Sequence, residues 1–467
     1  MNESDFLHVD GAQIVNARGE IVHLRGFCIG GWMTMENFMT GHPGHEAGFR
    51  AAVADVLGSE LRGFFFERFL NYFFAEEDVR FIRSLGCTVI RVALNYRHFE
   101  SDDMPFTYKP EGFARLDQVI EWAHSAGLYV ILDLHAAQGY QSSGWHCDNP
   151  GSRPMFWDQI SFQDRAVALW EAFATHYKDE PAVAGYNVLN EPEAIDVSRL
   201  NKFYRRAAEA IRAIDPQHIL FLEGNIFSQQ LEPLDPPFAE NLIYSTHYYV
   251  DPGLDAGEYP GVFQGQFYDR AWLKEHYAER AAWTRHHHVP HWFGEFGCIY
   301  GDPALEASRL RVMVDLIDIA DEFGDHWTIW NYKDIGKMGL VYAAPNSKWM
   351  KVTEPVRRLK TALRCDYWIE RQPSEIDRLI DQIESRVRDL TTDLPGRWDA
   401  LSDGLRATIS SGLLSQMLLP AFAHQFRGMG ETEIDTLMQS FALNQCVQRE
   451  GLIELLKARL PNREVMA

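Results

Sequence analysis

Two glutamates stand at the ends of apolar, strand-like segments. Glu191 follows "GYNVLN" (185–190), and Glu295 lies within "HWFGEF" (291–296). If both segments are strands of one parallel sheet, the two carboxyl groups meet at the same edge, although they are far apart in the sequence. Two such groups can share the work of cleaving a glycosidic bond, one as proton donor and the other as nucleophile. Glu191 and Glu295 are therefore the candidate catalytic pair.

Two further residues are suited to separate the pKa values of this pair. Arg91 lies in the strand-like "CTVIRVA" (87–93), and Tyr249 directly follows "LIYSTHY" (242–248). Arg91 by its charge and Tyr249 by a hydrogen bond would keep Glu295 ionised. A less compensated environment would keep Glu191 protonated, ready to act as the acid.

Other strand ends carry side chains suited to a carbohydrate substrate. His135, Asn190 and His247 are hydrogen-bond donors for sugar hydroxyls, and Asn190 is placed for a 2-hydroxyl, whose hydrogen bond strengthens in the transition state. Trp330 offers a flat face to the apolar side of a pyranose. We expect all of these side chains to surround one pocket.

The order of elements predicts how these residues are brought together. Eight short apolar runs alternate with amphipathic segments, which is typical of βα units around a parallel sheet, and several runs are apolar on both faces. The runs are 21–27, 87–93, 128–134, 183–189, 218–224, 242–248, 291–296 and 326–332. Helical patterns lie at about 75–85, 111–126, 161–177, 198–214, 270–288, 304–323 and 353–364, whereas the fifth crossover (about 228–240) is too rich in proline to assign. This order predicts an α/β (β/α)₈ barrel over residues 1–365, opened by a short hairpin that plugs the bottom of the barrel.

Strand-like runs end after Cys365, and residues 366–467 are predicted to form an all-helical C-terminal region. Ser374 with Asp377 three residues later is a plausible helix start. Three roles are open for this region: packing on the barrel, covering the active site, or pairing subunits into a homo-oligomer.

Composition excludes several classes of partner. A formal net charge of -22 disfavours nucleic acid, and we find no apolar window of 18 residues that would span a membrane. The N-terminus has no basic, apolar leader, which with six unpaired-looking cysteines predicts a cytoplasmic protein. "HHHVPH" (286–291) lacks metal-ligand spacing, so no metal is expected.

Three motifs together resemble glycoside hydrolase family 5. They are "LNEP" (189–192), "HYY" (247–249) and "GEFG" (294–297), each after a different predicted strand, and the match extends over about residues 7–364. The resemblance implies that Glu191 is the acid/base and Glu295 the nucleophile. It also implies retention of anomeric configuration and no cofactor.

Two longer segments are similar to the exo-β-1,3-glucanase branch of that family. They are "LRGFCIGGWMTMENFMTG" (24–41) and "DLHAAQGYQSSGWHCDN" (133–149). The resemblance places Glu36 where that branch holds the terminal sugar.

Long segments after the first, third and sixth strands (about 28–74, 135–160 and 249–269) would close a cleft into a pocket, which admits a chain end. The expected activity is therefore exo-hydrolysis of β-glucosides or short β-glucan oligosaccharides. Two alternatives are a catalytically weak carbohydrate-binding barrel with a partner-recruiting tail, and a transglycosidase.

Overall fold

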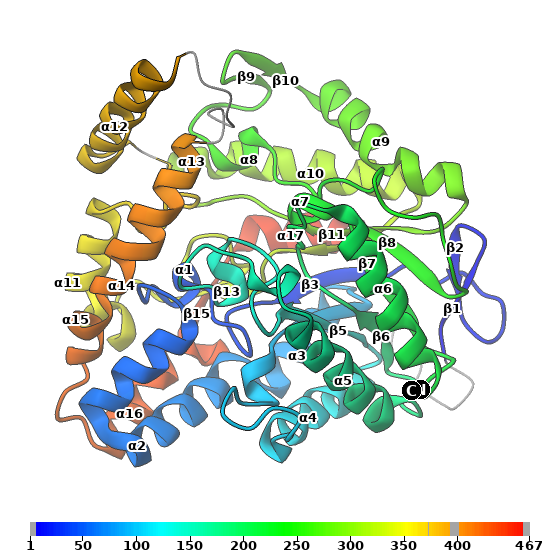
Figure 1. Cartoon of the computed structure of the whole chain (residues 1–467), viewed down its shortest axis with the longest axis horizontal. Coiled ribbons are helices and arrows are strands. Elements are labelled where there is room, and N and C mark those ends of the chain that lie inside the picture. The colour runs from blue at the N-terminus through cyan, green and yellow to red at the C-terminus, as the bar shows by residue number, and fades with distance from the viewer. Residues whose placement is uncertain (1–5, 372, 393–400, 461–467) are drawn as a thin grey trace.

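The computed structural model describes residues 6–371, 373–392 and 401–460 and shows a closed parallel barrel (Figure 1). Its strands are β3 (Arg25–Ile29), β4 (Val89–Asn95), β5 (Tyr129–Ala136), β6 (Val183–Asn187), β7 (Ile219–Glu223), β8 (Leu242–His247), β11 (His291–Phe296) and β12 (His326–Ile329). They pair in the order β11-β12-β3-β4-β5-β6-β7-β8, and every neighbouring pair is parallel. The predicted (β/α)₈ fold is confirmed. The first strand begins at residue 25 rather than at the expected 21.

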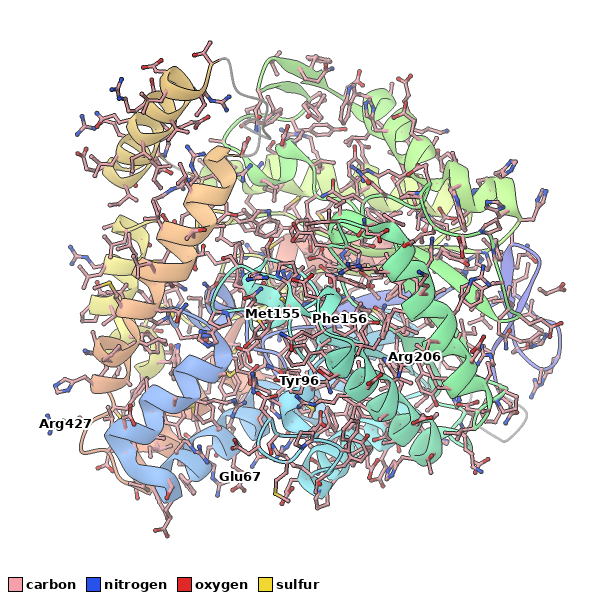
Figure 2. The ribbon with its side chains drawn as sticks, viewed as in Figure 1. Glu67, Tyr96, Met155, Phe156, Arg206 and Arg427 are labelled. Atoms are coloured by element: carbon pink, nitrogen blue, oxygen red, sulfur yellow. The ribbon has the colours of Figure 1, made fainter. Side chains whose placement is uncertain are left out.

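Helices surround the barrel as the amphipathic patterns predict. They are α3 (Glu76–Ser84), α4 (Pro110–Ala126), α5 (Ile160–Tyr177), α6 (Val197–Arg212), α9 (Arg270–His287), α10 (Glu306–Phe323) and α11 (Lys348–Ala362). The fifth crossover contains only the four-residue α7 (Asn225–Ser228), consistent with its proline content. Figure 2 shows that apolar and aromatic side chains such as Phe156 and Tyr96 lie inside the molecule, whereas the charged Glu67 and Arg427 point outwards.

A hairpin closes the N-terminal end of the barrel. Strands β1 (His8–Asp10) and β2 (Gln13–Val15) are antiparallel. Leu7 and Ile14 belong to a buried cluster with side chains from inside the barrel, among them Ile131 and Trp292. These apolar contacts exclude water from the end of the barrel opposite the strand C-termini.

The segment after β3 differs from the expected loop. It contains α1 (Asn37–Thr40) and the 28-residue α2 (Glu46–Phe73). Gly58 interrupts α2 with a φ of 79°, a conformation that glycine adopts without steric cost. Because the helical phase changes at this glycine, the apolar residues on either side do not form one continuous periodic pattern, and the helix is hidden in the sequence.

The C-terminal region is mainly helical. It contains α12 (Glu375–Thr391), α13 (Leu401–Arg406), a π-helical segment (Ala407–Leu414), α14 (Ser415–Met417), α15 (Leu419–His424), α16 (Glu431–Met438) and α17 (Glu450–Arg459). Ser374 and Asp377 form the expected capping box at α12. The all-helical expectation is wrong at one place, because β15 (Cys446–Gln448) pairs antiparallel with β14 (Val341–Ala343), which also pairs with β13 (Lys333–Asp334).

This region shares its core with the barrel helices. Phe422 and Phe426 of α15 and its C-terminal turn pack on Phe49 and Phe65 of α2 and on Trp349 of α11, with ring centroids 4.9–6.2 Å apart. Figure 1 shows α15 and α16 beside α2 and α11. Each buried phenylalanine contributes about 1.5–3 kcal/mol. The region is thus held to the barrel by a continuous hydrophobic core.

A buried ion pair adds a polar anchor at the same interface. The ammonium of Lys333, which has no exposed surface, lies 2.6 Å from a carboxylate oxygen of Asp78 and 3.0 Å from the Phe441 carbonyl oxygen.

Among the described residues, none of the helices combines the length and the apolar character that a membrane span requires.

Candidate active site

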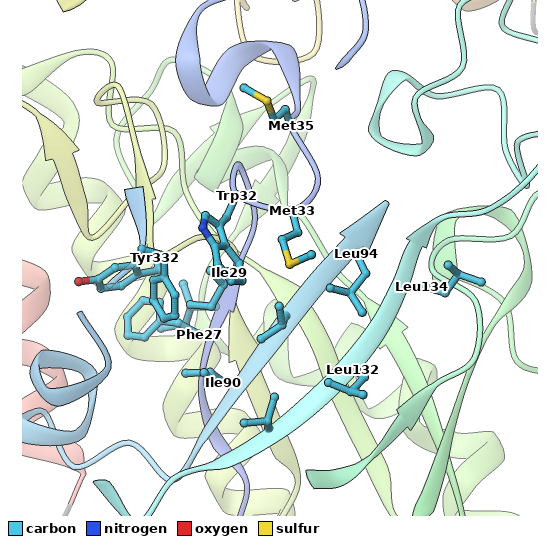
Figure 3. Packing of buried hydrophobic residues seen from close by; sticks show 14 of the residues in the cluster. Phe27, Ile29, Trp32, Met33, Met35, Ile90, Leu94, Leu132, Leu134 and Tyr332 are labelled. Atoms are coloured by element: carbon cyan, nitrogen blue, oxygen red, sulfur yellow. The ribbon is translucent and has the colours of Figure 1, made fainter. Parts of the chain in front are cut away.

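Strands β4 and β5 turn apolar side chains towards the surrounding helices, and towards their C-terminal ends they turn polar side chains into the barrel. Figure 3 shows Ile90, Leu132 and Leu134 in the hydrophobic layer that packs against the surrounding helices. Because side chains alternate along a strand, Arg91, Asp133 and His135 point into the barrel. The hydrophobic layer therefore fixes the polar groups that β4 and β5 carry into the barrel.

Arg91 lies beneath the site and is fully buried. Its guanidinium donates to the side-chain oxygens of Asn187 (3.0 Å), Asn190 (2.6 Å), Glu223 (3.0 Å) and Glu295 (2.5 Å). Asn190 is also fully buried. Arg91 thus holds other polar groups of the site and is itself covered by them.

Glu295 is held ionised. Its Oε1 accepts the hydrogen bond from Arg91, and its Oε2 accepts one from the Tyr249 hydroxyl at 2.8 Å. Burial alone would raise the pKa of Glu295, but the charges of His247, Arg91 and His135 outweigh it and lower the pKa. An ionised carboxylate with one oxygen on each of two donors is a well-oriented nucleophile.

Glu191 has the opposite character. Burial raises its pKa to about 7, against the effect of a 2.8 Å hydrogen bond from His247 Nδ1 to its Oε1. The neighbouring charges of Glu295 and Glu223 raise it further. One carboxylate oxygen each of Glu191 and Glu295 and one ring nitrogen of His247 lie within 4.8 Å of one another. Two close carboxyl groups with divergent pKa values can act as an acid and a nucleophile.

Glu223, at the end of β7, is a site residue that the sequence analysis missed. Its Oε2 accepts a 2.7 Å hydrogen bond from the Glu191 backbone N–H, where Glu191 has a positive φ of 43°. Burial opposes ionisation, yet His247 and Arg91 lower the pKa of Glu223 to about 2. A signal was present in "HILFLEG" (218–224), because this carboxylate also ends a strand.

Three predicted residues form the opposite wall. The His135 ring is stacked on Trp330, with ring centroids 5.0 Å apart. His135 Nδ1 forms a hydrogen bond of 2.8 Å with Asp133 Oδ2. His135 Nε2 lies 3.6 Å from a carboxylate oxygen of Glu36 and 3.4 Å from Asn190 Nδ2. Burial lowers the pKa of His135, but the Asp133 charge and the other carboxylates raise it to about 10, which favours the protonated ring beside Asp133 and Glu36.

These side chains line a pocket of about 310 Å³. Of the predicted site residues, the lining includes Glu36, His135, Glu191, His247, Tyr249, Glu295 and Trp330, whereas Arg91 and Asn190 lie below it. The predicted residues are therefore brought to one place, in two layers.

The pocket also has walls that the strand ends do not provide. Trp145 and His146 come from the segment after β5, and Tyr367 and Trp368 come from the C-terminal region. Tyr367 meets Trp145 edge-on at 5.8 Å, and Trp368 meets Tyr249 edge-on at 5.1 Å. For Tyr367 and Trp368 the sequence carried no signal, because no strand-end position marks them. Of the three roles considered for this region, the structure therefore shows two: packing and covering the site.

The positive charges around this site disfavour the binding of a metal ion. Within the described residues, Glu191, His247 and Glu295 are the acidic and histidine groups close enough to share one. Arg91 already pairs with Glu295, and the carboxylates raise the pKa of His247 to about 10 even though burial lowers it. These positive charges repel a cation. The absence of a cofactor remains a prediction.

A (β/α)₈ barrel with two close carboxyl groups at its strand ends defines the class of barrel glycosidases. The family model described as Cellulase (glycosyl hydrolase family 5) matches residues 53–336. A protein of Phanerodontia chrysosporium named "Beta-xylosidase" is 39% identical over 97% of this chain and 97% of its own length. The chain belongs to glycoside hydrolase family 5, as the motifs suggested, and is a hydrolase of β-glycosides.

Other relatives match over part of the chain. The "Probable glucan 1,3-beta-glucosidase A" of Aspergillus clavatus is 29% identical over 50% of this chain and 57% of its own length. A solved structure titled "Crystal structure of endogalactoceramidase" covers 70% of this chain and 75% of its own, with a TM-score of 0.53 and 19% identity. At that identity the likeness supports the barrel fold alone.

Proposed function

We propose that this protein is an exo-acting, retaining β-glycosidase in which Glu295 is the nucleophile and Glu191 the acid/base. The observation that carries the proposal is the distance of at most 4.8 Å between oxygens of two carboxyl groups whose pKa values are shifted in opposite directions. Retaining enzymes keep their carboxyl groups about 5–5.5 Å apart, whereas inverting enzymes need room for a water between them.

The reaction then proceeds in two displacements. Glu295 attacks the anomeric carbon, the bond from that carbon to the leaving oxygen breaks, and Glu191 gives its proton to that oxygen. This step leaves the sugar as an ester of Glu295. A water then loses its proton to the Glu191 carboxylate and attacks the anomeric carbon, which frees Glu295 and returns the proton to Glu191.

Three features support attack at a chain end. The pocket is enclosed by loops and by the C-terminal region. Glu36 and His135 form a polar wall beside the catalytic pair, and Trp145 and Tyr367, in edge-on contact, line the pocket as well. A terminal sugar fits such a closed space better than the middle of a polymer.

We infer that the terminal sugar is of the glucose or xylose configuration. The relative named "Beta-xylosidase" supports xylosides. Its match covers 97% of this chain and therefore includes most of the C-terminal region, which contributes Tyr367 and Trp368 to the pocket. The relative named "Probable glucan 1,3-beta-glucosidase A" supports glucosides, with a match to half of the chain.

Aryl β-glycosides provide the test. We expect Glu295→Ala to lose hydrolysis by several orders of magnitude, and azide to restore turnover as the α-glycosyl azide, because azide fits the space left by the carboxylate. NMR of the first product of the wild type should show the β-anomer. Full activity in Glu295→Ala, or an α-anomer from the wild type, would contradict the proposal.

A further inference from the structure

We propose that Trp368, supplied by the C-terminal region, makes the pocket selective for β-pentopyranosides by occupying the space into which a C5 substituent would point. This inference rests on the proposed function, because it assigns the position of the sugar from the roles of the catalytic residues. It gives the C-terminal region a part in substrate selection.

The two oxygens of Glu295 define the two sides of the bound ring. Oε1 faces Arg91, which also holds Asn190, so this side is that of the 2-hydroxyl. Oε2 faces the Tyr249 hydroxyl at 2.8 Å. Since the anomeric carbon has C2 on one side and the ring oxygen on the other, Tyr249 lies on the side of the ring oxygen and C5.

Trp368 lies against Tyr249, on the side of the pocket that faces the ring oxygen and C5. Its ring meets Tyr249 edge-on at 5.1 Å, and both belong to one hydrophobic cluster with Leu254, which also lines the pocket. The wall around C5 is therefore apolar. The polar wall of Glu36 and His135 lies instead beside Asn190, on the side of C2 and C3.

Trp368 is held in this position by its neighbours. Asp366 is buried and pairs with Lys360 at 2.6 Å, and Lys360 also donates to the Asn37 carbonyl oxygen at 2.7 Å. Ile369 is buried in the same cluster as Trp330. With anchors on both sides, the indole cannot easily move aside for a larger sugar.

The chemical consequence concerns one hydroxymethyl group. A pentopyranoside carries only hydrogens at C5, so it leaves the indole undisturbed. A hexopyranoside would press its hydroxymethyl against the indole and bury a hydroxyl among apolar side chains. A pocket distinguishes substrates that differ by one small group by roughly 10–200-fold.

The test compares kcat/KM for 4-nitrophenyl β-xyloside and β-glucoside in the full-length protein. We expect the wild type to prefer the xyloside by at least about tenfold. Trp368→Ala should lower this ratio by at least tenfold, mainly through a gain on the glucoside, and Trp368→Phe should lie between them. Trp272→Ala, which removes a partly exposed tryptophan from the surface of α9, should leave the ratio unchanged.

Three outcomes would overturn the inference. They are a wild type that prefers the glucoside, a ratio in Trp368→Ala equal to that of the wild type, and an equal loss on both substrates in Trp368→Ala and Trp368→Phe. Thermal unfolding of each variant shows whether it is folded. A wild type inactive on both glycosides would instead contradict the proposed function itself.

Discussion

The mutual influence of the Glu191 and Glu295 carboxyl groups can be measured without turnover. Replacing Glu295 by glutamine removes one negative charge and keeps the shape of the side chain. Arg91 and His247, which Glu295 helps to neutralise, then remain as positive charges near Glu191. Both changes favour the ionised form of Glu191, so its pKa should fall from about 7 in the wild type.

The size of the fall follows from the separation. Two unit charges 4.8 Å apart interact by about 3.5 kcal/mol at an effective dielectric constant of about 20, equivalent to about 2.5 in pKa. Burial, the largest cause of the raised pKa, is unchanged by the substitution. We therefore expect the pKa of Glu191 to fall by about 1–2.5 and to stay at or above the usual value for glutamate.

Carbon-13 NMR of protein labelled at the glutamate carboxyl carbons is the assay. Comparison with Glu191→Gln identifies the resonance of Glu191, and its titration is followed in the wild type and in Glu295→Gln. Glu171→Gln, which removes an exposed carboxylate of α5, is the control and should leave the titration in place. A pKa of Glu191 that stays the same or rises in Glu295→Gln would refute the electrostatic reasoning.

Two further predictions follow from the site and the core. Because Glu191 must be protonated to act as the acid, kcat/KM of the wild type should be high below pH 7 and fall as the pH rises through the pKa of about 7; a profile level to pH 9 would exclude Glu191 as the acid. Replacing Lys333 by methionine leaves Asp78 without its buried ammonium and should lower the free energy of unfolding in urea by about 3 kcal/mol, against a change below about 0.5 for the exposed Lys351→Met. Equal effects of the two lysine substitutions would show that the ion pair contributes little.

The barrel was predictable from the sequence because its strands are buried on both faces and its helices are regular. All eight strands and seven of the surrounding helices follow from apolar runs and helical spacing. Helix α2 was not predictable in the same way, since its kink at Gly58 divides the apolar pattern into two parts of different phase. Strand β15 is three residues long and forms by pairing with β14, a tertiary contact that no local pattern announces.

The floor of the site was predictable for the same topological reason. Parallel strands end on one side of the barrel, so Glu191, Glu295 and His247 had to meet once their strands were assigned. What the sequence could not provide was the division into layers. Arg91 and Asn190 have no exposed surface and lie beneath the residues that line the pocket. Arg91 contacts Glu295 directly, and Asn190 lies between Arg91 and His135.

The walls of the pocket follow a different logic from its floor. Strand ends fix the catalytic groups to a shared geometry, whereas walls come from whatever segment packs over them, here a turn after α11 that carries Tyr367 and Trp368. Lys360 and Ile369 hold the turn, and the helices that follow it pack on α2 through Phe422 and Phe426. Helix α2 lies outside the usual βα order, so the insertion after β3 and the C-terminal region depend on each other for burial. A substitution that loosens the packing of either segment would therefore shift Trp368 in the pocket wall. The barrel strands would still hold Glu191 and Glu295 in place.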